Sequence, residues 1–100
     1  MNGYFVSYNG KCLMEYSLGS AIHTAKEKSK EHGEAEVITE EPYFYHGYRF
    51  WLRSEKRYFK DGTLDHVEDL NVLYCAAKNK YLPIDEWKKE QNKFYGWVGE

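Results

Sequence analysis

The first third of the chain changes from an alternating pattern to a helical one. Residues 4–8 and 11–16 alternate between hydrophobic and polar positions, and Asn9-Gly10 stands between them. This pair predicts a hairpin, because a type I′ turn needs positive φ at both central residues. Hydrophobic residues then recur at helical spacing, at Leu18, Ala21, Ile22 and Ala25. Ser17 is suited to cap this amphipathic helix, and Gly33 is suited to end it.

The middle of the chain predicts a series of short strands. Four are expected, over residues 35–39, 48–53, 57–60 and 63–67. Glu41-Pro42 is expected to interrupt the first of them, since proline cannot donate to a ladder. Ser54-Glu55-Lys56 separates the next two, and Asp61-Gly62 predicts a second hairpin turn.

The last third predicts two helices. Asp69 is expected to cap the first, which would carry Leu70, Leu73, Tyr74 and Ala77. Pro83 or Asp85 opens the second, and Gly96 ends it. Its hydrophobic stripe would consist of Ile84, Trp87 and Phe94, with Lys88, Lys89 and Lys93 on the opposite side. The expected role of this stripe is to close the second face of the sheet within one molecule; the alternative is a symmetric dimer contact or an extension of a partner surface.

These elements predict an α+β fold. A mainly antiparallel sheet of four to six strands would pack on the N-terminal amphipathic helix, with one or two C-terminal helices beyond it. At 100 residues the chain is expected to form a single domain over 1–100. A faint echo at a shift of 52 positions would fit duplicated ββα units at about 4–32 and 57–82, although chance matches between turn and cap residues explain it better.

Composition narrows the class of protein. The net charge of -2 argues against a general DNA-coating protein and equally against an acidic DNA mimic. The start of the chain lacks a signal-peptide pattern, and no apolar stretch reaches a membrane-spanning length, so a cytoplasmic location without membrane association is expected. Cys12 and Cys75 are too few for a disulfide scaffold and are expected to be small buried thiols.

The most informative stretch covers residues 43–60. Eight of its eighteen residues are aromatic, and five basic residues against one acidic residue give it a charge of +4. If 48–53 is a strand, Arg49, Trp51 and Arg53 share one face. Such a face would suit a protein partner, because Trp, Tyr and Arg are enriched in interface hot spots, or would suit base stacking with phosphate pairing. The alternative is a purely structural sheet in which a helix covers Trp51.

Residues typical of catalysis or metal binding lack the required spacing. The histidines have no i, i+4 pair, and there is no Cys-x-x-Cys or Gly-x-Ser-x-Gly motif. The acidic run Asp65-His66-Val67-Glu68-Asp69 clusters at one point in the sequence, whereas a metal nuclease draws its carboxylates from separate elements. The sequence therefore predicts no enzyme, no metal site and no cofactor.

The leading hypothesis is a small non-enzymatic protein-binding module that inhibits a larger protein by blocking its working surface. Its predicted binding residues are Tyr43, Tyr45, Arg49, Trp51 and Arg53. In size and tyrosine content the chain is similar, only as a loose class, to small phage-encoded inhibitors of host or defence proteins. Single-stranded nucleic-acid (RNA) binding by the same residues is the alternative, and a metal-dependent enzyme using Asp65 or Glu68 is a distant third. The sequence leaves open whether the protein is a monomer or a homodimer.

Overall fold

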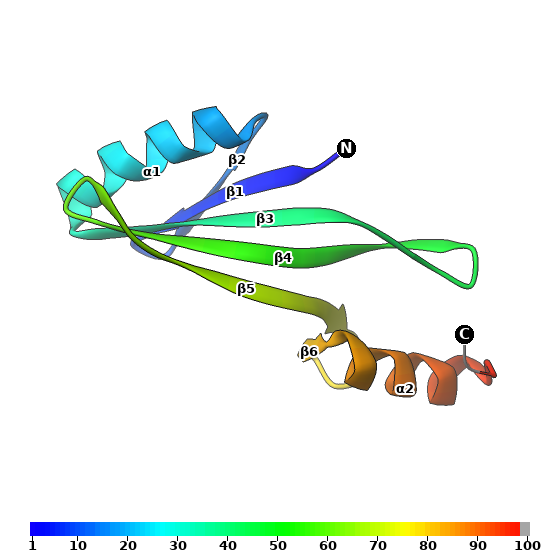
Figure 1. Ribbon diagram of the computed structural model, residues 1–100. Helices are drawn as coiled ribbons and strands as arrows, with labels where there is room; N and C mark the ends of the chain where they lie inside the picture. Colours follow the sequence, from blue (N-terminus) through cyan, green and yellow to red (C-terminus); the bar gives the residue numbers. More distant parts are fainter. Residues whose placement is uncertain (99–100) are drawn as a thin grey trace.

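The protein has an α+β fold built on one six-stranded sheet (Figure 1). The computed structural model describes residues 1–98. The strands run antiparallel in the order β2-β1-β3-β4-β5-β6, as the sequence predicts for the fold class. The elements in chain order are β1 (Gly3–Tyr8), β2 (Lys11–Glu15), α1 (Leu18–His32), β3 (Glu34–Tyr45), β4 (Tyr48–Lys60), β5 (Thr63–Cys75), β6 (Lys80–Pro83) and α2 (Ile84–Tyr95). The first helix thus follows a hairpin and does not open the chain.

The predicted turns and caps form as expected. Both residues of Asn9-Gly10 have positive φ, as a type I′ turn requires, and so do both residues of Asp61-Gly62. The Ser17 hydroxyl accepts a hydrogen bond from the Ser20 backbone N–H at 3.1 Å, which satisfies one of the unpaired donors at the start of α1. Gly33, at φ 90°, ends the helix.

The middle strands are longer than predicted. β3 continues through Pro42, which lies opposite Trp51 of β4. Its other neighbour, β1, has already ended at Gly3 opposite Glu40, so the edge of β3 is unpaired there and a missing N–H is tolerated. The two strands predicted around Ser54 are one strand, β4, with a bulge at that residue.

The prediction of a helix after Asp69 was wrong, because this segment continues β5. Leu73 and Cys75 are buried, and Tyr74 between them is exposed, which is the period of two of a strand. This period was missed in the sequence because Leu70, Leu73 and Tyr74 also fit the spacing of a helix. Pairing of Leu73 with Leu52 of β4 stabilises the strand. Residues 57–82 consequently contain strands and turns and no helix, so they lack the helix that the faint ββα echo would require.

Both helices pack on one face of the sheet, at opposite ends of the long strands. Along β3 the odd-numbered Ala35 and Val37 contact α1, and the odd-numbered Tyr45 contacts α2. The bulge at Ser54 shifts the alternation of β4 by one residue, so that Phe59 and Leu52 both reach this face. The twist of the strands rotates the face between its two ends, which places α1 above the sheet and α2 below it in Figure 1.

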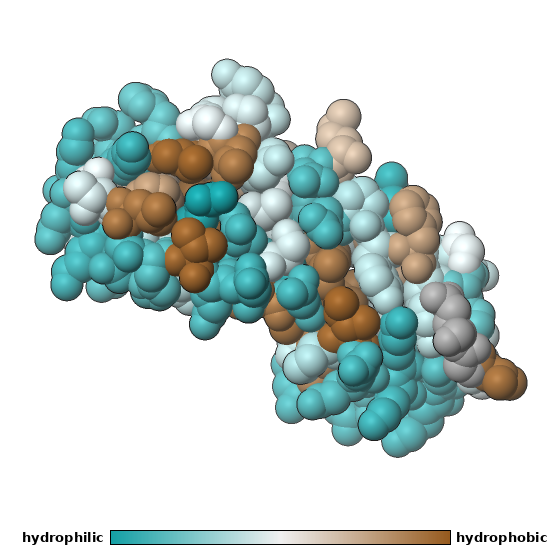
Figure 2. All heavy atoms as spheres, viewed as in Figure 1, coloured by the Kyte–Doolittle hydropathy of each residue, from teal (hydrophilic) through white to brown (hydrophobic). Residues whose placement is uncertain are grey.

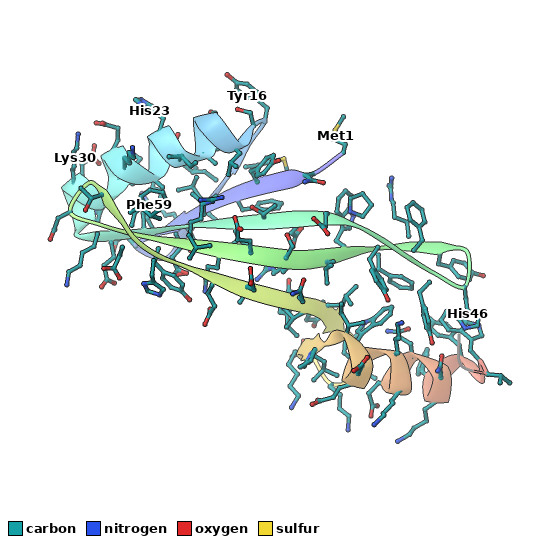
Figure 3. The ribbon with its side chains drawn as sticks, viewed as in Figure 1. Met1, Tyr16, His23, Lys30, His46 and Phe59 are labelled. Atoms are coloured by element: carbon teal, nitrogen blue, oxygen red, sulfur yellow. The ribbon has the colours of Figure 1, made fainter. Side chains whose placement is uncertain are left out.

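The core consists of two separate hydrophobic clusters. The first lies under α1 and includes Val6, Val37 and Phe59; the second lies under α2 and includes Tyr45 and Trp87. Figure 2 shows two hydrophobic areas at corresponding places, with more hydrophilic residues between them. In Figure 3, Phe59 lies at the α1 end and His46 lies at the α2 end. The molecule is accordingly elongated, with extents of 48 × 24 × 20 Å.

The stripe of α2 is only partly as predicted. Ile84 and Trp87 pack into the second cluster, so the expected packing within one molecule is confirmed. The expectation that they close the second face of the sheet was wrong, because α2 packs on the same face as α1. Phe94 is exposed, and Lys88 lies with its Nζ 5.4 Å from the centroid of the Tyr45 ring, so neither is where the helical pattern placed it. The Trp87 indole N–H donates to the carbonyl of Tyr74, which ties α2 to β5 at 3.1 Å.

Candidate functional site

The candidate site lies on the sheet face opposite both helices, here called the open face. Leu52, Leu73 and Leu82 point to α2, so their sequence neighbours point to the open face. Arg49, Trp51 and Arg53 of β4 therefore share this face, as their alternation predicts. Trp51 is 43 % exposed, so the helix cover that the purely structural alternative expected over this residue is not present in the described part of the chain.

Two tyrosines join these residues from neighbouring strands. Tyr74 of β5 lies directly opposite Tyr81 of β6, and their ring centroids are 5.3 Å apart. The Arg53 guanidinium carbon lies 4.1 Å from the Tyr81 ring centroid, and that of Arg49 lies 5.3 Å from the Trp51 ring. We call Arg49, Trp51, Arg53, Tyr74 and Tyr81 the aromatic patch. Four of these five, all but Arg53, line a shallow groove of about 400 Å³, and Glu40, Phe50 and Leu73 complete its lining.

Carboxylates of β3 pair with two cations of β4 on this face. Arg53 Nε donates to Glu40 at 3.0 Å, and Lys56 Nζ lies 2.8 Å from Glu36. Glu40 lies directly opposite Arg53, and Glu36 lies two positions along β3 from the residue opposite Lys56. Two of the basic charges counted along the sequence are therefore balanced locally in space. The patch therefore presents planar, rigid groups and oriented hydrogen-bond donors without a strongly positive field.

The structure separates Tyr43 and Tyr45 from the other predicted binding residues. Tyr45 is 1 % exposed, and its hydroxyl donates to Asn92 Oδ1 of α2 at 2.7 Å. Tyr43 lies on the same helix-covered face, with its ring edge-on to Trp87 at 6.1 Å between centroids. Because both side chains pack in or against the second cluster, they are not part of the candidate surface.

A second polar group on the open face surrounds Tyr58. Its ring stacks on His66 at 4.2 Å between centroids, and its hydroxyl donates to Glu68 at 3.1 Å. Partial burial and this hydrogen bond raise the pKa of Tyr58. The hydrogen bond with Glu36 raises the pKa of Lys56, against the effect of its own partial burial.

The acidic run of β5 does not assemble a metal site. His66 and Glu68 point to the open face opposite Tyr58 and Lys56, whereas Asp69 pairs with Glu55 on the other face. Asp65 lies in a bulge and contacts the His66 ring at 2.7 Å. Within residues 1–98, no three His, Cys, Asp or Glu side chains come together as candidate ligands.

The cysteines differ from each other in environment. Cys75 is buried in the second cluster as expected, but Cys12 is exposed on β2, so the prediction of two buried thiols was wrong for Cys12. The reason is that Cys12 pairs with Ser7 of β1, whose neighbours Val6 and Tyr8 face α1, so Cys12 points to the open face.

The sequence did not indicate that Tyr74 and Tyr81 belong to the site. Tyr74 was assigned to a helix, and β6 was not predicted. The available signal was the alternation of Leu73 and Cys75 with Tyr74, which matches a strand whose polar-tipped residues face outward.

Comparison of the chain with models of protein families, with characterised proteins and with solved structures gives no match. Among the described helices, none combines the length and apolar character needed to cross a membrane.

Proposed function

We propose that this protein is a non-enzymatic binding module that holds a protein partner against its open sheet face, and that it acts by covering a working surface of that partner. The observation that carries the proposal is the aromatic patch on a face that neither helix covers. Trp, Tyr and Arg are the residues most enriched in binding hot spots, and here all three types surround one groove.

The charge arrangement supports a protein partner over a nucleic acid. A strand of nucleic acid needs uncompensated cations along its path, since phosphate contacts dominate its affinity. On this face Glu40 and Glu36 already neutralise Arg53 and Lys56. A protein surface, in contrast, is suited to mixed charges at the rim of an aromatic centre.

The test begins with capture of the partner from cells that encode the protein and continues with purified components. Trp51→Ala combined with Arg53→Ala should weaken binding at least about tenfold, because truncating a hot-spot residue costs about 2 kcal/mol or more. Phe94→Ala removes another exposed aromatic ring, on α2, and should leave the affinity unchanged. Equal affinities of the double variant and the native protein, at matched thermal stability, would remove the aromatic patch from the interface.

A parallel measurement addresses the nucleic-acid alternative, which the shared face of Arg49, Trp51 and Arg53 still favours geometrically. Fluorescence anisotropy with mixed single-stranded DNA and RNA oligonucleotides at low salt should show no binding. Salt-sensitive binding that Trp51→Ala abolishes would replace the protein-partner proposal.

A further inference from the structure

The described sheet has several unpaired edges, and β2 differs from the others because it carries neither a proline nor a bulge. Exposed strand edges are templates for pairing, and proteins block them with proline, charge or bulges. The chain has only two prolines, and both lie on unpaired edges: Pro42 on β3 beyond the end of β1, and Pro83 on β6. The part of β5 that extends beyond β6 carries Asp65, Glu68 and Asp69 and is broken by bulges.

The edge of β2 is regular and exposes hydrophobic side chains. All five of its residues pair with β1 in unbroken register. Leu13 is exposed, and Met14 is 75 % exposed. The two-residue turn makes Tyr8 and Lys11 a hydrogen-bonded pair, so the N–H and C=O groups of Lys11 and Leu13 point to β1. Those of Cys12 and Met14 therefore point outward, where β2 has no neighbouring strand within residues 1–98.

The sequence of this edge is complementary to itself. Lys11-Cys12-Leu13-Met14-Glu15 has a cation at one end and an anion at the other. In an antiparallel pair centred on Leu13, Lys11 of each copy would lie opposite Glu15 of the other. Cys12 would lie opposite Met14, and these are the residues whose backbone groups point outward. Shifting the centre by one residue loses the match of opposite charges.

Contacts from α1 hold the acidic end in place. Glu15 Oε1 accepts hydrogen bonds from the hydroxyls of Ser20 at 2.6 Å and Thr24 at 3.0 Å. Both bonds use the same oxygen, so Oε2 remains suited to an ammonium group. α1 itself packs mainly over β1 and β3, and the exposed side chains of β2 show that it leaves this edge accessible.

We propose that β2 pairs with β2 of a second copy of this chain, antiparallel and centred on Leu13, to join two sheets into one. The two-fold axis stands perpendicular to the sheet, so the open faces of both copies point to the same side. The interface is small, which predicts a dimer that forms with increasing concentration.

The first test is the molar mass in solution, by sedimentation equilibrium from micromolar to millimolar protein. The native protein should shift from monomer to dimer over this range. Leu13→Lys places two cations on the axis and should keep the protein monomeric. Leu64→Lys adds the same charge at an exposed leucine of β5 and should dimerise as the native protein does. A native protein that stays monomeric, or a Leu13→Lys variant that still dimerises, would overturn the proposal.

A second test fixes the register and does not depend on the stability of Leu13→Lys. In a Cys12→Ser background, Leu13→Cys places two thiols opposite each other in a non-hydrogen-bonded pair, the closer type of cross-strand pair. Mild oxidation should link this variant into a covalent dimer. Lys11→Cys in the same background serves as the control, because position 11 lies opposite position 15 and should not link. Equal linkage of the two variants, or linkage of neither, would contradict the register.

Discussion

At the scale of single residues, ion pairs and hydrogen bonds on the open face determine how side chains respond to pH. Lys56 lies between Glu36 and Tyr58, with its Nζ 2.8 Å from the carboxylate and 5.3 Å from the ring centroid. The pKa values of Lys56 and Tyr58 are both raised, the first by its bond to Glu36 and the second by partial burial and its bond to Glu68. The folded protein therefore holds both protons more tightly than the unfolded chain does.

This difference predicts a loss of stability in alkali. The contribution of each group to the free energy of unfolding is fully present below its unfolded pKa, 10.5 for Lys56 and 10.0 for Tyr58, and is lost as the pH rises through the folded value. Lys56→Met combined with Tyr58→Phe should reduce the fall in Tm between about pH 9 and about pH 11. The Tm of both proteins at neutral pH sets the baseline, and an equally steep fall in the double variant would contradict the assignment.

At the scale of elements, the sequence correctly predicted the turns and helix ends that depend on local chemistry. Asn9-Gly10, Ser17 and Gly33 each satisfy a backbone requirement within a few residues, and the hairpin and α1 form as expected. Simple alternation also placed Arg49, Trp51 and Arg53 on one face, but whether a helix covers that face depends on where α2 packs, which the local pattern does not specify. The strand nature of residues 69–75 was not predicted, because it depends on pairing of Leu73 with Leu52, which is distant in sequence. The bulge at Ser54 was not predicted for the same reason. It lets hydrophobic residues of both halves of β4 reach one face, and this depends on the packing of distant elements.

The cap of α1 gives a prediction at this scale. Ser17→Ala should lower the free energy of unfolding by about 1 kcal/mol, because the Ser20 N–H loses its acceptor. Ser17→Asp should retain native stability or exceed it, since a carboxylate accepts the same bond and favours the positive end of a helix dipole whose first turn has no acidic residue. Urea denaturation measures both. Stabilities that do not differ between the alanine and aspartate variants would show that the cap contributes nothing.

At the scale of the whole molecule, the long strands β3, β4 and β5 join two hydrophobic clusters that share no residue. The first depends on α1 and includes Phe59, and the second depends on α2 and includes Trp87. Between them the helix-side surface carries a shallow polar depression of about 460 Å³ that includes Thr39 and Glu55. Few buried apolar contacts therefore connect the two ends, and each end can lose packing with little direct effect on the other.

This arrangement predicts local rather than uniform loss of stability. Trp87→Phe removes the hydrogen bond to the Tyr74 carbonyl and part of the packing, at a cost of about 1–3 kcal/mol. Native-state hydrogen exchange should then speed up first in residues 43–50 and 72–95, while α1 keeps its protection. The matched variant Phe59→Leu should produce the reverse, with faster exchange in α1 and β1 and little change in α2. If each substitution accelerated exchange equally at both ends, the two clusters would form a single cooperative unit, and the aromatic patch would depend on α1 as much as on α2.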